Sequence, residues 1–287
     1  MSSVLCVITY AMSNPKYNNT QPFAQERNNN VNFNYVWDQP TLNWIPEQAS
    51  SISSQYILAN AKSFINKFGS NPDINQAVSI TSPETIWDGS SEYLFPPDTS
   101  TSIQMVSSSN NDSQEIVIQG LDADFKEQSW SGNLNGNTFV QVPSPYKWTR
   151  IFRVYNNGST DLEGDVEISQ AGVPSNVYAK ILNGNNQTLM SVYTIPADYT
   201  GYLTKYQTTA HNSQSSSEIG YTIHMKTREL GKVFRVKSIT SAGTSHEVTK
   251  KFDFPNLLPP KTDIIFNAVS ANGNNGSVDV EFNIALL

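Results

Sequence analysis

The last strand-like stretch of the chain, Val278-Asp279-Val280-Glu281-Phe282-Asn283-Ile284-Ala285-Leu286, decides the fold class. Apolar residues occupy every second position from Val278 to Leu286, and polar or small residues lie between them. A period of two predicts a β-strand that buries one face and turns the other toward solvent. We therefore expect this segment to be a core strand of an antiparallel sheet.

Similar segments continue upstream, separated by turn sequences such as Asn135-Gly136, Asn157-Gly158 and Asn183-Gly184. Asn-Gly pairs favour tight hairpin turns, and a spacing of about 8 to 12 residues is typical of antiparallel sandwiches and barrels. The predicted strands are 103–107, 114–120, 137–142, 147–156, 163–169, 176–182, 188–195, 201–209, 219–228, 232–240, 245–252, 262–270 and 277–286. We predict a mainly β, antiparallel, jelly-roll or sandwich-like protein with an extended N-terminal arm and one short helix.

The first fifty residues differ from the rest in composition. Their prolines break helices and central strands, yet the segment is too aromatic for a solvated linker. We expect 1–50 to be an extended arm that packs on a neighbouring subunit or on its own domain. The residues expected to make that contact are Tyr35, Trp37, Leu42, Trp44 and Ile45.

A short helix is predicted after the arm. Ser54 can cap it, Gly69 and Asn71-Pro72 can end it, and its apolar residues fall on one side: Ile57, Leu58, Ala61, Phe64, Ile65 and Phe68. The predicted domains are thus an arm at 1–50, a helix and connector at 51–85 and a β domain at 86–287. The β domain has an optional division into subdomains near 86–145 and 146–287.

The composition excludes some classes of function. A net charge of -7 argues against general nucleic-acid binding, which needs a surplus of Lys and Arg. Cys6 is the only cysteine, so no internal disulfide is possible and the chain is expected to fold in a reducing cytoplasm. The apolar run from Val4 to Ile8 is too short to cross a bilayer, and we expect no membrane partner.

We expect no catalytic residue, metal or cofactor. His211, His224 and His246 lie on separate segments without metal-binding spacing, and no nucleophile elbow or phosphate-binding loop is present. Asp122 and Asp124 could form an acid/base pair or a Ca²⁺ site, but carboxylates that cap a turn explain them better.

One predicted hairpin carries a candidate binding face. If 219–228 pairs with 232–240, alternation places Tyr221, Ile223 and Met225 on one face, opposite His224. The other face also carries a cationic strip of Lys226 and Arg228, joined by Arg235 and Lys237. Such a strip suits an acidic neighbouring subunit or a sugar acid, and an ordinary solvated face is the alternative.

Aromatic residues provide a second candidate, because rings stack on sugar faces. The aromatic residues considered are Trp87, Tyr93, Trp130, Tyr146 and Trp148. Filling the β core is the more common role of such residues.

Several short motifs together resemble a family of virion structural proteins from tailed, mostly marine, bacteriophages. They are Ile86-Trp87-Asp88-Gly89, Tyr93-Leu94-Phe95-Pro96, Gly120-Leu121-Asp122-Ala123-Asp124-Phe125, Leu134-Asn135-Gly136, the stretch from Tyr193 to Leu203, and Lys261-Thr262-Asp263-Ile264. The resemblance covers roughly residues 86–287 and carries no catalytic residue over.

The resemblance implies a virion component, folded in the host cytoplasm before assembly. We expect a head-decoration or head-to-tail accessory subunit whose partners are other copies of itself and other capsid or tail proteins. The alternatives are a fibre or receptor-binding subunit that binds host surface polysaccharide and, more distantly, a tail enzyme that cleaves glycosides.

Overall fold

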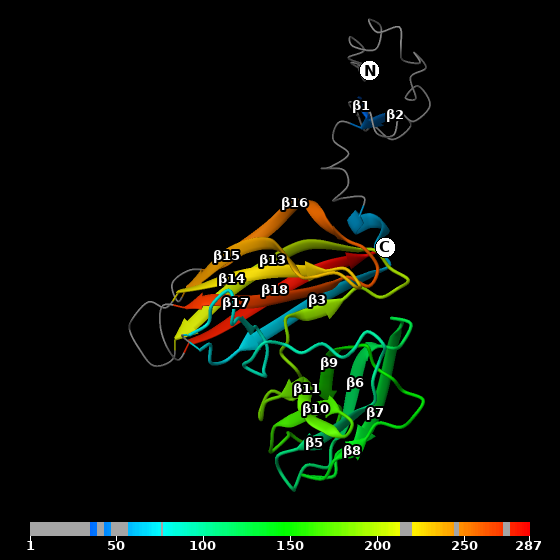
Figure 1. Ribbon diagram of the computed structural model, residues 1–287, viewed down its shortest axis with the longest axis vertical. Coiled ribbons are helices and arrows are strands. Elements are labelled where there is room, and N and C mark those ends of the chain that lie inside the picture. Colours follow the sequence, from blue (N-terminus) through cyan, green and yellow to red (C-terminus); the bar gives the residue numbers. More distant parts are fainter. Residues whose placement is uncertain are drawn as a thin grey trace, which may run out of the picture. The chain divides into compact units, whose positions relative to one another are not determined.

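The computed structural model describes residues 57–75, 77–212, 220–243, 247–271 and 276–287, and the backbone of 35–38 and 43–46 (Figure 1). The chain divides into two compact units, Met1–Asn60 and Ala61–Leu287. Within the first unit, β1 (Tyr35–Asp38) pairs antiparallel with β2 (Asn43–Pro46), with Trp37 opposite Trp44.

The segment predicted to be an extended arm thus contains a short hairpin, which the sequence analysis did not predict. Its prolines do not prevent the pairing, because Pro40 lies between the strands in sequence and Pro46 is the last residue of β2. Leu42 and the side chains of Tyr35, Trp37, Trp44 and Ile45 lie outside the described residues.

The predicted helix is largely wrong. Among the described residues, helix is limited to 57–60, and β3 (Ser63–Asn71) follows it. β3 pairs along its whole length with β18 (Gly276–Leu286), which satisfies its backbone through a partner more than two hundred residues away. Phe64 and Phe68, expected in the core, are 60% and 43% exposed.

The second unit contains four antiparallel sheets, so the prediction of a mainly β, antiparallel protein is confirmed (Figure 1). One sheet has the order β16 (Val248–Leu258), β13 (Gly201–Asn212), β18 and β3. Another has the order β12 (Val192–Thr194), β17 (Asp263–Ala271), β14 (Gly220–Arg228) and β15 (Arg235–Gly243), with β4 (Glu84–Thr85) on β17. We refer to these two sheets as the terminal sheet pair.

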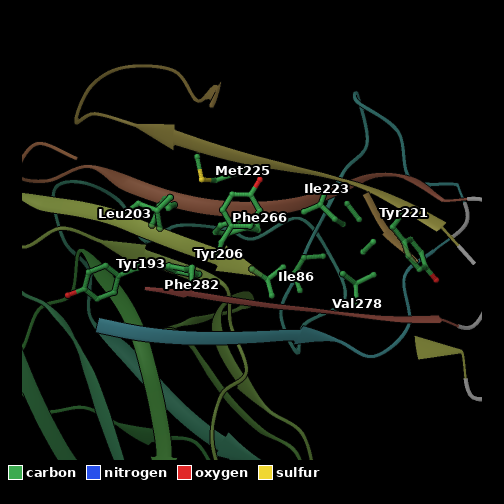
Figure 2. Close-up of a cluster of buried hydrophobic side chains, with 14 of the residues drawn as sticks. Ile86, Tyr193, Leu203, Tyr206, Tyr221, Ile223, Met225, Phe266, Val278 and Phe282 are labelled. Atoms are coloured by element: carbon green, nitrogen blue, oxygen red, sulfur yellow. The ribbon is translucent and has the colours of Figure 1, made fainter. Parts of the chain in front are cut away.

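The terminal sheet pair shares one hydrophobic core (Figure 2). Tyr206 and Phe282 come from one sheet and Phe266 from the other, and the Phe266 ring lies 5.3 Å from Tyr206 and 5.2 Å from Phe282 between centroids. All five alternating apolar residues of β18, from Val278 to Leu286, are buried. The predicted core strand is confirmed.

The other two sheets form the inserted sheet pair, which comes between β4 and β12 in sequence. Their orders are β11 (Val173–Ile181), β10 (Val166–Gln170), β5 (Ile103–Ser107), β8 (Val140–Gln141), and β7 (Glu127–Asn133), β6 (Glu115–Leu121), β9 (Arg150–Asn156). Their shared core draws on residues from Ile103 to Ile181. The optional boundary near 145 does not match this division, because β9 to β11 belong with β5 to β8.

Two linking segments, one between β4 and β5 and one between β11 and β12, join the inserted pair to the terminal pair. Trp87 and Met190 form a β-bridge, and both belong to a small third cluster with Tyr93, Val192 and Ile265. The Tyr93 hydroxyl donates a hydrogen bond of 2.9 Å to the carbonyl oxygen of Tyr178 in β11. The joint between the pairs is thus packed and hydrogen-bonded.

Candidate docking surface

The predicted hairpin exists and its inward face is the predicted one, but on the other face His224 is buried. β14 pairs with β15, and Tyr221, Ile223 and Met225 point into the core of the terminal sheet pair (Figure 2). The alternation in β14 buries this face because the second sheet covers it. The opposite face therefore carries whatever contacts the hairpin makes beyond its own core.

A β-bulge changes the direction of the side chains on β15. Met225 lies opposite Ser238 whereas Lys226 lies opposite Val236, so Lys237 is an extra residue in β15. Arg235, Val236 and Lys237 are consequently all exposed. Without the bulge, strict alternation would have placed consecutive side chains of β15 on opposite faces of the sheet.

Exposed apolar side chains accompany these cations. They are Val233 at 75%, Ile239 at 59%, Val236 at 46% and Leu230 at 39% exposure. Together with Lys232, Arg235 and Lys237 they form the hairpin surface. Apolar groups beside unpaired charges are typical of a surface that another molecule covers.

The positive charge extends to β16, which belongs to the other sheet of the terminal pair. Lys250 of β16 donates a hydrogen bond of 2.7 Å to Ser238 Oγ of β15, and Lys251 is exposed beside it. Residues 205–261 contain nine Lys and Arg against four Asp and Glu, a surplus of five in a chain of net charge -7. The hairpin surface therefore lies in a positive region of an acidic protein.

Arg228, which was predicted to belong to the cationic strip, is not part of the exposed hairpin surface. Its Nε donates a hydrogen bond of 2.9 Å to Asp263 Oδ2, and its guanidinium lies over the rings of Phe95 and Phe234 at 4.8 and 4.6 Å. Of the four predicted cations, Arg235 and Lys237 are exposed, Lys226 is half-buried and Arg228 is tied into the interior.

Asp263 is the centre of a buried charge network that sequence reasoning missed. The carboxylate is fully buried on β17 and accepts hydrogen bonds from Arg150 Nε at 2.7 Å and from Thr194 Oγ1 at 2.6 Å. Arg150 comes from β9 of the inserted pair and also binds Asp98 Oδ1 at 2.7 Å. No sequence spacing brings these residues together, because Arg150 and Asp263 are 113 positions apart.

The network fastens the two sheet pairs together. Burial alone would lower the pKa of Arg150, but hydrogen bonds and charge from Asp263 and Asp98 outweigh it, so the pKa is raised. The charges of Arg150 and Arg228 balance those of Asp98 and Asp263. Both carboxylate oxygens of Asp263 already accept hydrogen bonds from these arginines. This arrangement suits a rigid joint rather than a site that receives a substrate.

The histidines do not converge. His211 Nε2 lies 3.1 Å from Asp279 Oδ2, whereas His224 is buried with Nδ1 unpaired and has a pKa lowered by burial and then by Lys226. His246 lies outside the described residues. Within the part of the chain that the structure describes, no group of three or more His, Cys, Asp or Glu could hold a metal ion.

Asp122 caps a turn, as the sequence analysis predicted in preference to a catalytic or Ca²⁺-binding role. Its Oδ1 accepts hydrogen bonds from the backbone N–H groups of Asp124 at 2.8 Å and Lys126 at 2.9 Å. Phe125 in the same turn has a positive φ of 63°. The Asp122 carboxylate is thus committed to backbone donors.

The five candidate aromatics do not form an exposed platform. Trp87, Tyr93 and Trp148 are buried, and Trp130 and Tyr146 pack half-buried against the core of the inserted pair. They serve packing, as the alternative interpretation held.

No family model matches the chain, and no curated protein matches it either. In the described segments, no helix is long and apolar enough to cross a membrane. Evidence on function therefore comes from the geometry of the hairpin surface.

Proposed function

We propose that this protein is a bacteriophage virion structural subunit, a head-decoration or head-to-tail accessory protein that acts through protein–protein interfaces. Two features support the proposal: the strand order of the terminal sheet pair and the exposed hairpin surface. The resemblance of the short motifs to tailed-phage virion proteins points in the same direction.

The strand order supports a jelly roll. Numbering β3 and then β12 to β18 as strands 1 to 8 gives the sheet orders 1-8-3-6 and 2-7-4-5. Two four-stranded antiparallel sheets that interleave the first and last strands in this way have the double Greek-key connectivity of jelly rolls, which viral capsid proteins use. The inserted pair then lies between strands 1 and 2, where a long loop leaves the pairing intact.

The four sheets of the second unit also suggest a propeller-like ring of four blades. Propellers build each blade from four-stranded repeats around a central channel. Here β18 lies between β3 and β13, and the buried side chains gather into one core for each pair of sheets. We favour the jelly roll because this connectivity and these paired cores follow from it directly.

The exposed hairpin surface is the main support for the proposed role. Val233 and Ile239 expose large apolar areas that would gain from being covered, at about 25 cal/mol per Å² removed from water. Arg235 and Lys237 beside them provide orientation and long-range attraction to an acidic partner. A subunit that joins a lattice needs this combination.

A second candidate is binding of an acidic surface polysaccharide, since jelly rolls also occur in lectins and the hairpin surface is cationic. The buried positions of Trp87, Tyr93 and Trp148 count against it, because stacking on sugars needs exposed rings.

Binding to particles that lack the protein separates these candidates. Labelled wild-type protein should co-sediment with such particles, and Arg235→Ser with Lys237→Ser should bind at least about tenfold more weakly. A matched control, Lys126→Ser with Lys147→Ser, removes two exposed cations of the inserted pair and should bind normally. Binding to acidic glycans on an array without binding to particles would support the second candidate. Release of reducing ends from host polysaccharide would reveal a glycosidase.

A further inference from the structure

We propose that the partner of the hairpin surface is a second copy of this chain, which presents an acidic loop face in its inserted sheet pair. The acidic loop face is defined by Glu115, Asp161 and Glu163. This inference rests on the proposed structural role and specifies one of its interfaces.

The carboxylates of this face are held in place by neutral donors. Glu115 accepts hydrogen bonds from Asn157 Nδ2 at 2.7 Å and Ser131 Oγ at 2.8 Å. Glu163 accepts one from Asn111 Nδ2 at 2.7 Å, and Asp161 accepts one from Asn186 Nδ2 at 2.8 Å. These contacts fix the positions of the charges without neutralising them.

The loops that carry these residues are joined by hydrogen bonds. Gln114 Nε2 donates a hydrogen bond of 2.8 Å to the carbonyl oxygen of Asp161, and the backbone N–H of Asn157 donates one of 2.8 Å to the carbonyl oxygen of Glu115. Segments 111–115 and 157–163 therefore form one ordered surface. Preorganised charges lose little entropy when a partner binds.

Both surfaces lack opposite charges within their own copy. Among the described residues, Glu115, Asp161 and Glu163 make no salt bridge, whereas the nearby Asp165 pairs with Lys180 at 3.2 Å. Lys232, Arg235 and Lys237 likewise have no carboxylate partner in the described part of the chain. Each surface could supply what the other lacks.

An exposed ring near the acidic loop face provides an apolar counterpart. The backbone N–H of Gly136 donates a hydrogen bond of 2.8 Å to the carbonyl oxygen of Asp112, which places the 135–139 turn against the acidic loops. Phe139 at the end of this turn is 44% exposed. Val233 and Ile239 of the hairpin surface can cover such a ring.

Because the two surfaces belong to different sheet pairs, we propose a heterologous contact, in which each copy uses its hairpin surface on one neighbour and its acidic loop face on another. The hairpin surface lies in the terminal pair and the acidic loop face in the inserted pair. A contact of this kind repeats head to tail and gives a closed ring or an open filament. Repetition of this type is what a component of a symmetric particle requires.

Charge reversal provides the test, with sedimentation velocity as the measurement. Wild-type protein should self-associate, and the association should weaken as salt is added. Arg235→Glu with Lys237→Glu, and separately Asp161→Lys with Glu163→Lys, should each weaken association at least about tenfold by placing like charges opposite each other. Lys126→Glu with Lys147→Glu lowers the net charge as much as Arg235→Glu with Lys237→Glu does, but away from both surfaces, and should associate normally.

Mixing the two reversed variants is the decisive step. Each then presents to the other a surface of opposite sign, so the equimolar mixture should associate within about tenfold of the wild type. Rescue in the mixture also shows that both variants are folded. A mixture that stays monomeric, or wild type that stays monomeric at every concentration, overturns the inference. Binding of the wild type to particles would then still support the proposed function, with another virion protein as the partner.

Discussion

Asp88 is a buried carboxyl group that uses only half of its hydrogen-bonding capacity. Its Oδ2 accepts a hydrogen bond of 2.8 Å from the backbone N–H of Leu189, whereas Oδ1 is buried without a partner. Burial raises the pKa of Asp88 to about 7, against the opposing effect of the Leu189 hydrogen bond. The residue lies where the two linking segments meet, so its protonation affects the joint between the sheet pairs.

The pKa shift of Asp88 predicts a pH dependence of stability. Between pH 4 and pH 7, roughly, the folded protein holds a proton on Asp88 that the unfolded chain has released, so the free energy of unfolding falls as the pH rises. The loss should be roughly 2–4 kcal/mol. Asp88→Asn keeps the acceptor for Leu189 and never ionises, so it should be more stable than the wild type at pH 7.

Urea unfolding at pH 4.5, 5.5 and 6.5 measures this effect, with Asp124→Asn as a control at an exposed carboxylate. The series stops below pH 7 because burial lowers the pKa of Lys67 to about 7, which adds a second titration above that point. Equal pH slopes in the wild type and Asp88→Asn would show that Asp88 is ionised in the folded state.

At the scale of elements, β18 holds one sheet of the terminal pair together. It lies between β13 and β3 and contributes five buried apolar side chains to the shared core. Each contributes about 1.5 to 3 kcal/mol when fully buried, which in sum is comparable with the net stability of a whole domain. A chain that ends at Asn275 should therefore be unfolded or insoluble. A soluble truncated chain with a cooperative thermal transition would instead identify β18 as an exchangeable element.

The joint between the sheet pairs yields a second prediction at this scale. Arg150→Met removes the guanidinium that binds Asp263 and leaves that carboxylate with less compensation, so stability should fall by about 3–5 kcal/mol. Asp98→Asn touches the same guanidinium from a side chain that is 44% exposed and should cost about 1 kcal/mol or less. Denaturant unfolding compares them. Similar losses in both variants would mean that the network does not act as a buried joint.

The sequence revealed strands with apolar alternation and missed those without it. All thirteen predicted strands overlap strands from β5 to β18, and 103–107 matches β5 to the residue. β7 was missed because Trp130 is its only large apolar side chain, and this edge strand pairs only with β6. β3 was mistaken for a helix because Phe64, Ile65 and Phe68 have helical spacing. Its buried positions include Lys67 and Asn71, which no apolar alternation marks, and its strand state depends on pairing with the distant β18.

The candidate site shows the same limit. Alternation correctly separated Tyr221 and Ile223 from the outward face of the hairpin. The bulge at Lys237 and the capture of Arg228 by Asp263 depend on pairing partners that no local pattern specifies. The sequence analysis did not single out Val233 and Ile239, because their exposure follows only from their position on β15 and in the preceding turn.

At the scale of the whole molecule, the described part of the second unit has one large core for each sheet pair, a buried charge network between the pairs and exposed surfaces of opposite sign. The terminal pair presents the cationic hairpin surface, and the inserted pair presents the acidic loop face. We interpret this distribution as the basis of assembly into a repeating structure.

Electron microscopy of particles labelled with a gold-conjugated antibody against this protein tests the proposed virion role most directly. The particles should come from lysates of the host in which the gene is expressed, and particles from a deletion of the gene are the control. We predict gold at fixed, repeated positions on the head or at the neck, and no gold on the control. Purified particles that carry the protein in no position, although it is abundant in the lysate, would contradict a structural role in the virion.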